Sequence, residues 1–486
     1  MSEDNDLNKI DYSKLGFKAG LEIHQQLDSH KLFCNCPSLL RQDEPDFEVS
    51  RRLHAVAGES GEVDIAAMHE ASLDKEFIYQ GYGNNVCLID LDEEPPHEIN
   101  KDALKTALHI ALLLNCKIET LTQIMRKTVI DGSNTTGFQR TIMIARDGYV
   151  ETSFGRVGIL GMYLEEDAAR IIGKEKGKSI FRLDRLGIPL VEIATKPDIK
   201  NAEQAKETAL KIGEILRACK VKRGIGTIRQ DVNMSIKGGE RIEIKGFQDI
   251  RNIEKTIEKE TKRQIKLVKE NKSVSEVRNA LADGSTEYLR PVPGSARMYP
   301  ETDLPLLKIH KNFIDEAKKT LPRLREEVEE ELKKRGLHEE MIKLLFQENK
   351  IEEFKQLLHI YDNANFVVKV LVMFLKDISR RENKSLEEVG NILEDSLADI
   401  LNAVKKKKIS ENDVKDVMTE IVRGKSLEEA IKIEKADLGN IEERIANLIK
   451  SKPGLSEQAY MGLIMQEFKG KIEGKEAREI IRKYVK

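Results

Sequence analysis

Several acidic residues of this chain lie inside stretches that are otherwise apolar. Glu165, Glu166 and Asp167 follow the run ILGMYL, and Glu192 lies within PLVEIAT. A buried carboxylate is costly unless it pairs with a cation. The pattern therefore indicates anionic ligands held on strands. A structural ion pair at Glu192, or an acidic helix start at Glu165 and Glu166, would explain the same residues and remains open.

Two further segments place polar residues two positions apart. Glu22 and His24 lie in GLEIHQQL, and Asp231 and Asn233 lie in RQDVNMS. On a strand, such pairs point to one face. A carboxylate beside an imidazole can hold a divalent cation or work as an acid–base pair. An exposed Glu–His pair on a sheet surface is the simpler alternative for the first segment.

Basic residues accompany these carboxylates. Arg229 precedes Asp231, and Lys245 follows Glu243 in RIEIKG. Oxygen ligands from several strands, together with cationic side chains, are what Mg²⁺-dependent phosphoryl transfer requires. The nearby Gly224-Ile-Gly226 is a weak signal for a phosphate loop and is more typical of a tight turn.

The first 250 residues contain most of the strand signals. Short β-branched runs, broken by Gly, Asn and Asp, include FKAGLEIHQQL, NVCLIDL, RTIMIARDGYVET, PLVEIAT, DVNMSIKG and ERIEIKG. Helical spacing is found at 100–114, 201–218 and 253–270. Helices packed on a largely antiparallel sheet predict an α+β domain.

Beyond about residue 312, the 3.6-residue period of helices dominates. Ser385-Leu-Glu-Glu388 and Ser426-Leu-Glu-Glu429 are capping boxes that mark helix starts. Pro453-Gly454 separates a last helical segment. We therefore predict three domains: a β-rich domain at 1–310, an all-α helical domain at 311–410 and a small helical tail domain at 411–486.

Composition narrows the class of protein. A chain of 486 residues is expected to form several domains. No apolar run approaches the roughly 20 residues that span a bilayer. The five scattered cysteines favour reduced thiols in a cytoplasmic protein. Cys34 and Cys36 lack a second closely spaced cysteine pair, so zinc is not expected. An acidic first hundred residues and a more basic remainder are weak evidence for a polyanionic partner.

Long motifs in this chain resemble one family. They are GLEIHQQL, HKLFCNCPS, MRKTVIDGSNTTGFQRT, YLEEDAAR, RLDRLGIPLVEIATKPDI, GTIRQDVNMSI, RIEIKGFQ, MYPETDLP and MGLIMQEFKGKIEGKEA. In this order they resemble the GatB/GatE family of tRNA-dependent amidotransferase subunits. The stretch Asp131–Arg140 resembles the sequence found at this place in the GatE branch of the family. GatB proteins carry an aromatic segment there instead.

The resemblance implies an archaeal, cytoplasmic ligase (glutaminyl-tRNA synthase, glutamine-hydrolysing) that forms a carbon–nitrogen bond with ATP and Mg²⁺. Its substrate would be tRNA(Gln) mischarged with glutamate, whose γ-carboxylate is phosphorylated and then amidated to Gln-tRNA(Gln). The ammonia would come from a GatD-like, asparaginase-type glutaminase subunit, in a heteromer of the dimer-of-heterodimers kind. No membrane contact is expected.

The resemblance also implies which residues act. The residues expected to be catalytic are Glu22, His24, Glu166 and Glu192. The Mg²⁺ ligands would be Glu22, His24, Glu165, Glu166 and Glu192. The nucleotide site would include Arg229, Asp231, Lys245 and Glu243. The β-rich domain would be the family's cradle, similar to the glutamine synthetase catalytic fold. The tail domain would bind tRNA. Asp184, between Arg182 and Arg185, is expected to be a structural ion pair.

One feature departs from the family. GatE proteins usually carry an inserted domain, similar to one of bacterial aspartyl-tRNA synthetases, before MYPETDLP. Here only residues 271–295 occupy that interval. Whatever that domain contributes to tRNA binding or discrimination is therefore in doubt. Two alternatives for the whole chain stay open: a GatB-type subunit that also acts on Asp-tRNA(Asn), and a tRNA-binding scaffold without catalysis.

Overall fold

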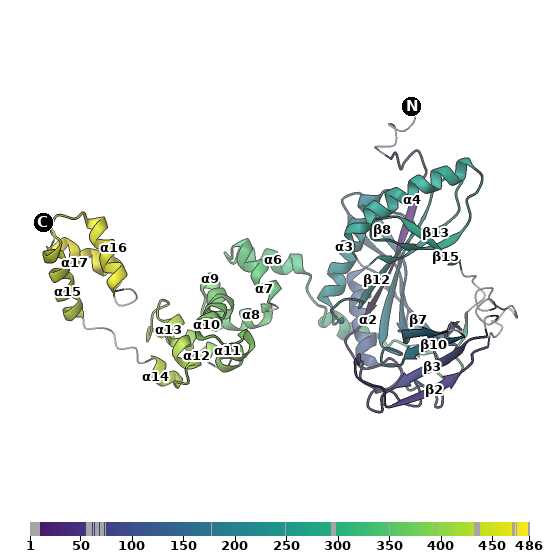
Figure 1. Cartoon of the computed structure of the whole chain (residues 1–486), viewed down its shortest axis with the longest axis horizontal. Coiled ribbons are helices and arrows are strands. Elements are labelled where there is room, and N and C mark those ends of the chain that lie inside the picture. The colour runs from purple at the N-terminus through teal and green to yellow at the C-terminus, as the bar shows by residue number, and fades with distance from the viewer. Residues whose placement is uncertain are drawn as a thin grey trace. The chain divides into compact units, whose positions relative to one another are not determined.

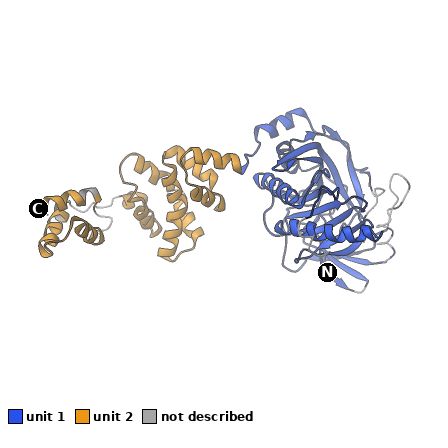
Figure 2. Ribbon diagram, turned by 90° about the horizontal axis from the view of Figure 1, so that it is seen from above, with its two compact units in different colours: residues 1–325 blue, residues 326–486 orange. Residues whose placement is uncertain are grey.

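The computed structural model divides the chain into two compact units, residues 1–325 and 326–486 (Figure 2). It describes residues 10–54, 74–175, 177–247, 249–292, 298–348, 350–394, 396–431, 438–468 and 474–484, with a few isolated residues between them. The first unit is a mixed α+β domain built on a large sheet, and the second is all helical, as predicted.

An 11-stranded sheet is the frame of the first unit (Figure 1). Ten strands follow the order β15-β14-β13-β12-β1-β11-β8-β7-β6-β16, and β4 pairs with β7. The strands are β1 (Lys18–Gln26), β4 (Lys117–Ile118), β6 (Ile124–Thr128), β7 (Phe138–Thr152), β8 (Gly155–Glu166), β11 (Pro189–Thr195), β12 (Ile228–Ser235), β13 (Ile242–Phe247), β14 (Glu276–Ala280), β15 (Thr286–Pro291) and β16 (Met298–Pro300). Most neighbours are antiparallel, and β13 with β14 is a parallel pair.

Helices cover one face of this sheet. They are α2 (Lys101–Leu113), α3 (Ala202–Ala218) and α4 (Arg251–Lys269). The Asn100 side chain accepts hydrogen bonds from the backbone at the start of α2, and Asn201 does the same for α3. Leu21 and Ile23 of β1 are fully buried in the core that these helices share with the sheet. Since side chains alternate along a strand, Glu22 and His24 point to the opposite face.

A second sheet carries its own apolar cluster. Its order is β2-β3-β10-β9, formed by β2 (Phe47–Arg51), β3 (Glu76–Gly81), β9 (Arg170–Glu175) and β10 (Lys178–Arg182). Tyr79 donates a hydrogen bond to the carbonyl of Gly132, which ties this sheet to the Asp131–Arg140 stretch. Two further strands, β5 (Leu121–Thr122) and β17 (Leu307–Lys308), pair with each other, and α5 (Lys311–Lys319) packs against α2.

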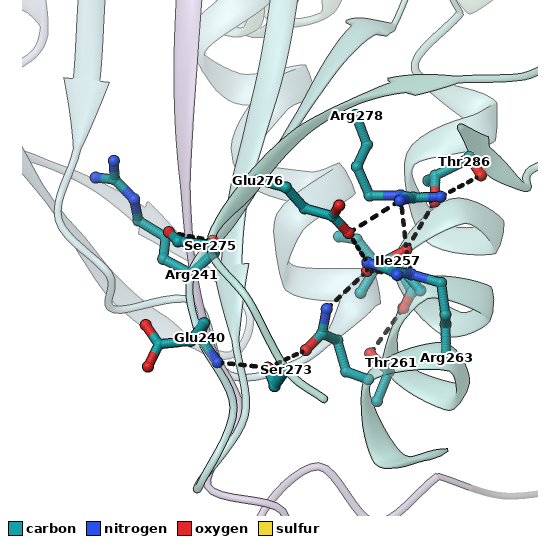
Figure 3. Close-up of polar contacts among 12 residues, drawn as sticks. Glu240, Arg241, Ile257, Thr261, Arg263, Ser273, Ser275, Glu276, Arg278 and Thr286 are labelled. Carbon is teal, nitrogen blue, oxygen red and sulfur yellow. Dashed lines mark hydrogen bonds and ion pairs between the residues drawn. The ribbon is translucent and has the colours of Figure 1, made fainter. Parts of the chain in front are cut away.

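The interval in which the family resemblance predicts an inserted domain forms a short hairpin here. Between α4 and β15, a buried ionic network joins the hairpin to the helix (Figure 3). Arg263 bridges Glu260 and Glu276 at 2.8 and 2.7 Å, and Arg278 contacts Glu276 at 2.9 Å. These ion pairs therefore fix β14 against α4. Residues 293–297 lie outside the described residues.

The described residues of the second unit form two apolar clusters. The first spans residues 328–430 and is built from α6 (Arg325–Lys334), α7 (Glu339–Gln347), α8 (Ile351–Ile360), α9 (Ala364–Val368), a π-helical segment (Lys369–Phe374), α10 (Leu375–Glu382), α11 (Leu386–Leu393), α12 (Leu397–Lys405), α13 (Val414–Val422) and α14 (Leu427–Ile431). The second spans 441–481 and comprises α15 (Leu438–Ser451), α16 (Glu457–Glu467) and α17 (Gly474–Tyr484). Apolar packing of the first cluster thus continues beyond residue 410, the boundary predicted from sequence.

Within the described ranges most local predictions are confirmed, and the strand predicted at NVCLIDL is wrong; the similar run GEVDIAAM lies largely outside those ranges. Ser385 accepts a hydrogen bond from the backbone of Glu388 and caps α11 as predicted. The run NVCLIDL forms turns instead of a strand, because the backbone N–H groups of Asn85 and Val86 bond back to the Tyr82 carbonyl. No helix in the described ranges has the length and apolarity to cross a bilayer.

Candidate active site

The helix-free face of the large sheet carries a row of ionisable side chains. In register, Glu22 lies opposite Asp231 and His24 lies opposite Glu192 on its other neighbour. Alternation along β8 and β13 brings Glu165 and Glu243 to the same face. The sheet therefore assembles five carboxylates and a histidine from five strands. They form the candidate active site: Glu22, His24, Glu165, Glu192, Asp231 and Glu243.

These side chains form two groups with metal-ligand spacing. His24, Glu165 and Glu192 each offer an atom within 4.8 Å of the others, and so do Glu22, Asp231 and Glu243. The second group offers only oxygen, the donor that Mg²⁺ prefers. The donor chemistry thus fits the expected ion.

Charge in the first group is only partly balanced. His24 Nε2 lies 3.4 Å from Glu192 Oε2, and Lys127 Nζ lies 2.9 Å from Glu165 and 3.6 Å from Glu192. Burial alone would lower the pKa of His24, but Glu192 raises it above the usual value. Burial raises the pKa of Glu165, although Lys127 opposes the rise. Burial alone would also raise the pKa of Glu192, but His24 and Lys127 hold it below its usual range.

In the second group, one ammonium faces two of the three carboxylates. Lys245 Nζ contacts Asp231 at 2.7 Å and Glu243 at 2.5 Å. Asn233 donates to Glu22 at 3.0 Å, so it orients this carboxylate without neutralising it. Burial raises the pKa of Glu22, with help from Glu192 and Glu243. Five carboxylates face two lysines, and this excess of negative charge favours a bound cation.

Glu166 does not join the other expected ligands. It points to the other side of β8, where its carboxylate lies 3.3 Å from Arg140 Nη1. Arg140 also bonds to Glu301 at 2.8 Å, and Glu301 pairs with Arg126 as well. Burial alone would raise the pKa of Glu301, but the two arginines lower it to about 2. The structure therefore brings Glu165, and not Glu166, to His24 and Glu192.

Sequence reasoning missed several members of the site. Lys127 of MRKT contacts the acidic groups of both β8 and β11, and Thr141 and Gln139 donate to Glu165 at 2.8 and 3.0 Å. The alternation of side chains along RTIMIAR and its partner strand could have indicated that these residues share a face. It places them in the site only once the order of the strands is known. Asp184 is a structural ion pair as expected, but its partner is Arg170, which lies outside the flanking pair considered from sequence.

The cysteines are closer together than their spacing indicates. Cys34, Cys36, Cys87 and Asp90 each offer a ligand atom within 4.8 Å of the others. Hydrogen bonds from the Cys34 and Cys36 thiols lower the pKa of Cys87, which favours its thiolate. Zinc was not expected because Cys87 is isolated in the sequence. In the structure, the turns that replace the predicted strand bring Cys87 close to Cys34 and Cys36.

Comparison with known proteins shows the family of this chain. Residues 17–315 match the GatB/GatE catalytic domain, and residues 352–485 match the GatB domain. The first match covers more than half of the chain, which therefore belongs to the GatB/GatE family of amidotransferase subunits.

Its full-length relatives include archaeal proteins named as the E subunit of glutamyl-tRNA(Gln) amidotransferase. The chain is 38% identical to the protein of this name from Methanocaldococcus jannaschii, over 98% of this chain and 100% of the relative. For its counterpart in Methanosarcina acetivorans the identity is 33%, over 99% of both chains. The first alignment has 637 positions, more than the 486 residues here, so that relative carries segments without a counterpart in this chain.

Proposed function

We propose that this chain is the subunit that converts Glu-tRNA(Gln) to Gln-tRNA(Gln) with ATP. The γ-phosphoryl group passes from ATP to the glutamyl γ-carboxylate, leaving ADP; ammonia then attacks the acyl phosphate carbon and phosphate leaves. The observation that carries the proposal is the site of five carboxylates, two lysines and His24 within a catalytic domain of this family. The naming of the relatives as subunits of Glu-tRNA(Gln) amidotransferases supports the substrate.

Residues of the site divide into cation-holding and phosphate-facing groups. Mg²⁺ would be held by Glu22, Asp231 and Glu243 or by His24, Glu165 and Glu192, and when bound it offsets the charge of phosphate oxygens. Lys245 and Arg229 would face phosphates, because both cations border the same sheet face. Glu166, which the family resemblance places among these ligands, would instead have a structural role, because it pairs with Arg140 on the other side of β8.

The division of labour with a partner also belongs to the proposal. We propose a GatD-like glutaminase subunit as the source of ammonia and the cytoplasm as the location. The naming of the relatives as one subunit of an amidotransferase supports a partner, because the amidation proposed here needs a source of ammonia.

Ammonium can replace the partner in a direct test. The purified chain, given Mg²⁺, ATP, ammonium chloride and Glu-tRNA(Gln), is expected to form ADP and Gln-tRNA(Gln), with ATP hydrolysis dependent on the charged tRNA. A scaffold would bind the tRNA and hydrolyse no ATP. Amidation of Asp-tRNA(Asn) at a comparable rate would favour the GatB-type interpretation instead.

We propose that the tail binds tRNA, and the packing sharpens how to test this. Because α13 and α14 belong to the apolar cluster of residues 328–430, removal of 411–486 would expose that core. Removal of 438–486 takes away only the separate cluster of α15–α17. We expect this truncation to weaken tRNA affinity at least tenfold in filter binding, while saturating tRNA restores much of the ammonia-dependent rate. Unchanged affinity would exclude this role for residues 438–486.

We also propose a thiolate metal site at Cys34, Cys36, Cys87 and Asp90, for which zinc is the best-fitting ion. Protein purified without chelators is expected to contain about one zinc per chain by elemental analysis, and Cys87→Ser is expected to lose most of it. Cys219→Ser, which removes a buried thiol elsewhere, is the matched control and should retain the metal. The site would be contradicted if the native protein contains no zinc and its melting temperature does not change when zinc is added.

A further inference from the structure

Two arginines share one buried carboxylate beside the candidate active site. Asp167, directly after β8, is almost completely buried. Its Oδ1 accepts a bond of 2.8 Å from Arg229 Nη2, and its Oδ2 lies 3.8 Å from Arg185 Nε. Gln26 Nε2 donates to Oδ2 at 2.6 Å. Asp167 is therefore fixed from three sides and holds the two guanidinium groups near each other.

These arginines border the row of carboxylates on the large sheet. Arg229 lies opposite His24 in the β1–β12 register. Gln26 follows His24 by two residues on the same strand and therefore points to the same face. Asp167 follows Glu165 by two residues. The Arg185–Asp167–Arg229 group thus lies at the end of the strands that carry the candidate cation ligands.

The group has uncompensated positive charge and free donors. Arg185 gives Nε and Nη2 to the carbonyls of Ala168 and Ala169, which carry no charge. In the part of the chain that the structure describes, Nη1 of Arg185 and Nη1 of Arg229 have no hydrogen-bond partner, and their side chains are 25% and 45% exposed. One carboxylate cannot neutralise two guanidinium groups.

A neighbouring pair shows the contrast. Arg170 gives Nε and Nη2 to the two oxygens of Asp184 at 3.0 and 2.5 Å, a bidentate pair that satisfies both charges. Arg185 lacks such a partner. Burial lowers its pKa, and repulsion from Arg229 and Arg170 adds to the effect although Asp167 opposes it. An anion placed between Arg185 and Arg229 would remove this repulsion.

We propose that Arg185 and Arg229, anchored on Asp167, form a clamp for a substrate phosphate group next to the carboxylate site. The proposal rests on the proposed function, which supplies two sources of phosphate: the triphosphate of ATP and the phosphodiesters at the 3′ end of the tRNA. Guanidinium forks match phosphate oxygens in geometry and stay charged at every physiological pH. Arg185 is the new member, since Arg229 was expected from the motif alone.

The test measures binding of the two sources separately in the full chain. Calorimetry with a non-hydrolysable ATP analogue and Mg²⁺ covers the first, and filter binding of tRNA(Gln) without nucleotide covers the second. Arg185→Gln is expected to weaken one of the two at least tenfold. Arg185→Lys keeps the charge without the fork and should lose less. Loss in the first assay assigns the clamp to ATP, and loss in the second assigns it to tRNA.

Controls separate this inference from the proposed function. Arg156→Gln removes one positive charge from an exposed hairpin, where Arg156 pairs with Glu151, and should change neither affinity. Folding of each variant is checked by its melting temperature. If folded Arg185→Gln and Arg185→Lys bind both probes within twofold of the unaltered chain, the clamp is excluded. Absence of tRNA-dependent ATP hydrolysis in the unaltered chain would instead exclude the proposed function, while the binding assays would still decide the clamp.

Discussion

Glu192→Gln is expected to lower tRNA-dependent ATP hydrolysis and Gln-tRNA formation about a thousandfold, a size typical of removing a main electrostatic element of a reaction site. The amide keeps the shape of the side chain but loses its charge. Glu192 is the residue that connects His24, at 3.4 Å, with Lys127, at 3.6 Å. Loss of the Glu192 charge therefore removes a candidate cation ligand. It also frees the His24 side chain and lowers the pKa of His24.

The comparison variant is Glu151→Gln, which alters an exposed carboxylate of the same sheet that pairs with Arg156. It should keep the full rate. Binding of Glu-tRNA(Gln) to Glu192→Gln should remain close to that of the unaltered chain, because the change is confined to the carboxylate site. If ATP turnover by a folded Glu192→Gln stays within threefold of normal, the assignment of this site is wrong.

The sequence was a good guide to local structure because local signals determine it. Asn100 and Asn201 cap the helices that they were expected to start, and alternation in PLVEIAT places Glu192 on the polar face. Alternation within one strand also predicted that Glu22 and His24 share a face. These inferences need only the period of the element and the preferences of its end residues.

The remainder of the site depends on strand order, which no local signal determines. Lys127 reaches Glu165 because β6, β7 and β8 are neighbours, and Cys87 reaches Cys34 because a turn replaces an expected strand. Asp184, in the turn after β10, likewise pairs with Arg170 of β9. In each case the partner is remote in sequence, so the pairing follows from tertiary packing and could not be derived from spacing.

Substitution of Glu165 is the second change for which we expect a large loss of activity. Glu165 lies in the candidate active site, whereas Glu166, the next residue, forms a structural ion pair with Arg140. Glu165→Gln is expected to lower ATP turnover at least a hundredfold with little change in the free energy of unfolding. Burial raises the pKa of Glu165 although Lys127 opposes the rise, so the fold favours its charged form less than water does, and a neutral amide costs little stability. The same amide cannot replace the charge that faces Lys127 and His24.

Glu166→Gln should show the opposite pattern. Arg140 is buried and pairs with both Glu166 and Glu301, so removing one partner leaves its guanidinium under-compensated. We expect a loss of about 1–3 kcal/mol in the free energy of unfolding, with turnover retained within tenfold at a temperature where the variant is folded. Denaturant unfolding and steady-state ATP hydrolysis measure the two effects on the same samples. Full stability with abolished turnover in Glu166→Gln would restore Glu166 to the role that the family resemblance implied, and would mean that β8 presents its last residue, and not the one before it, to the substrate.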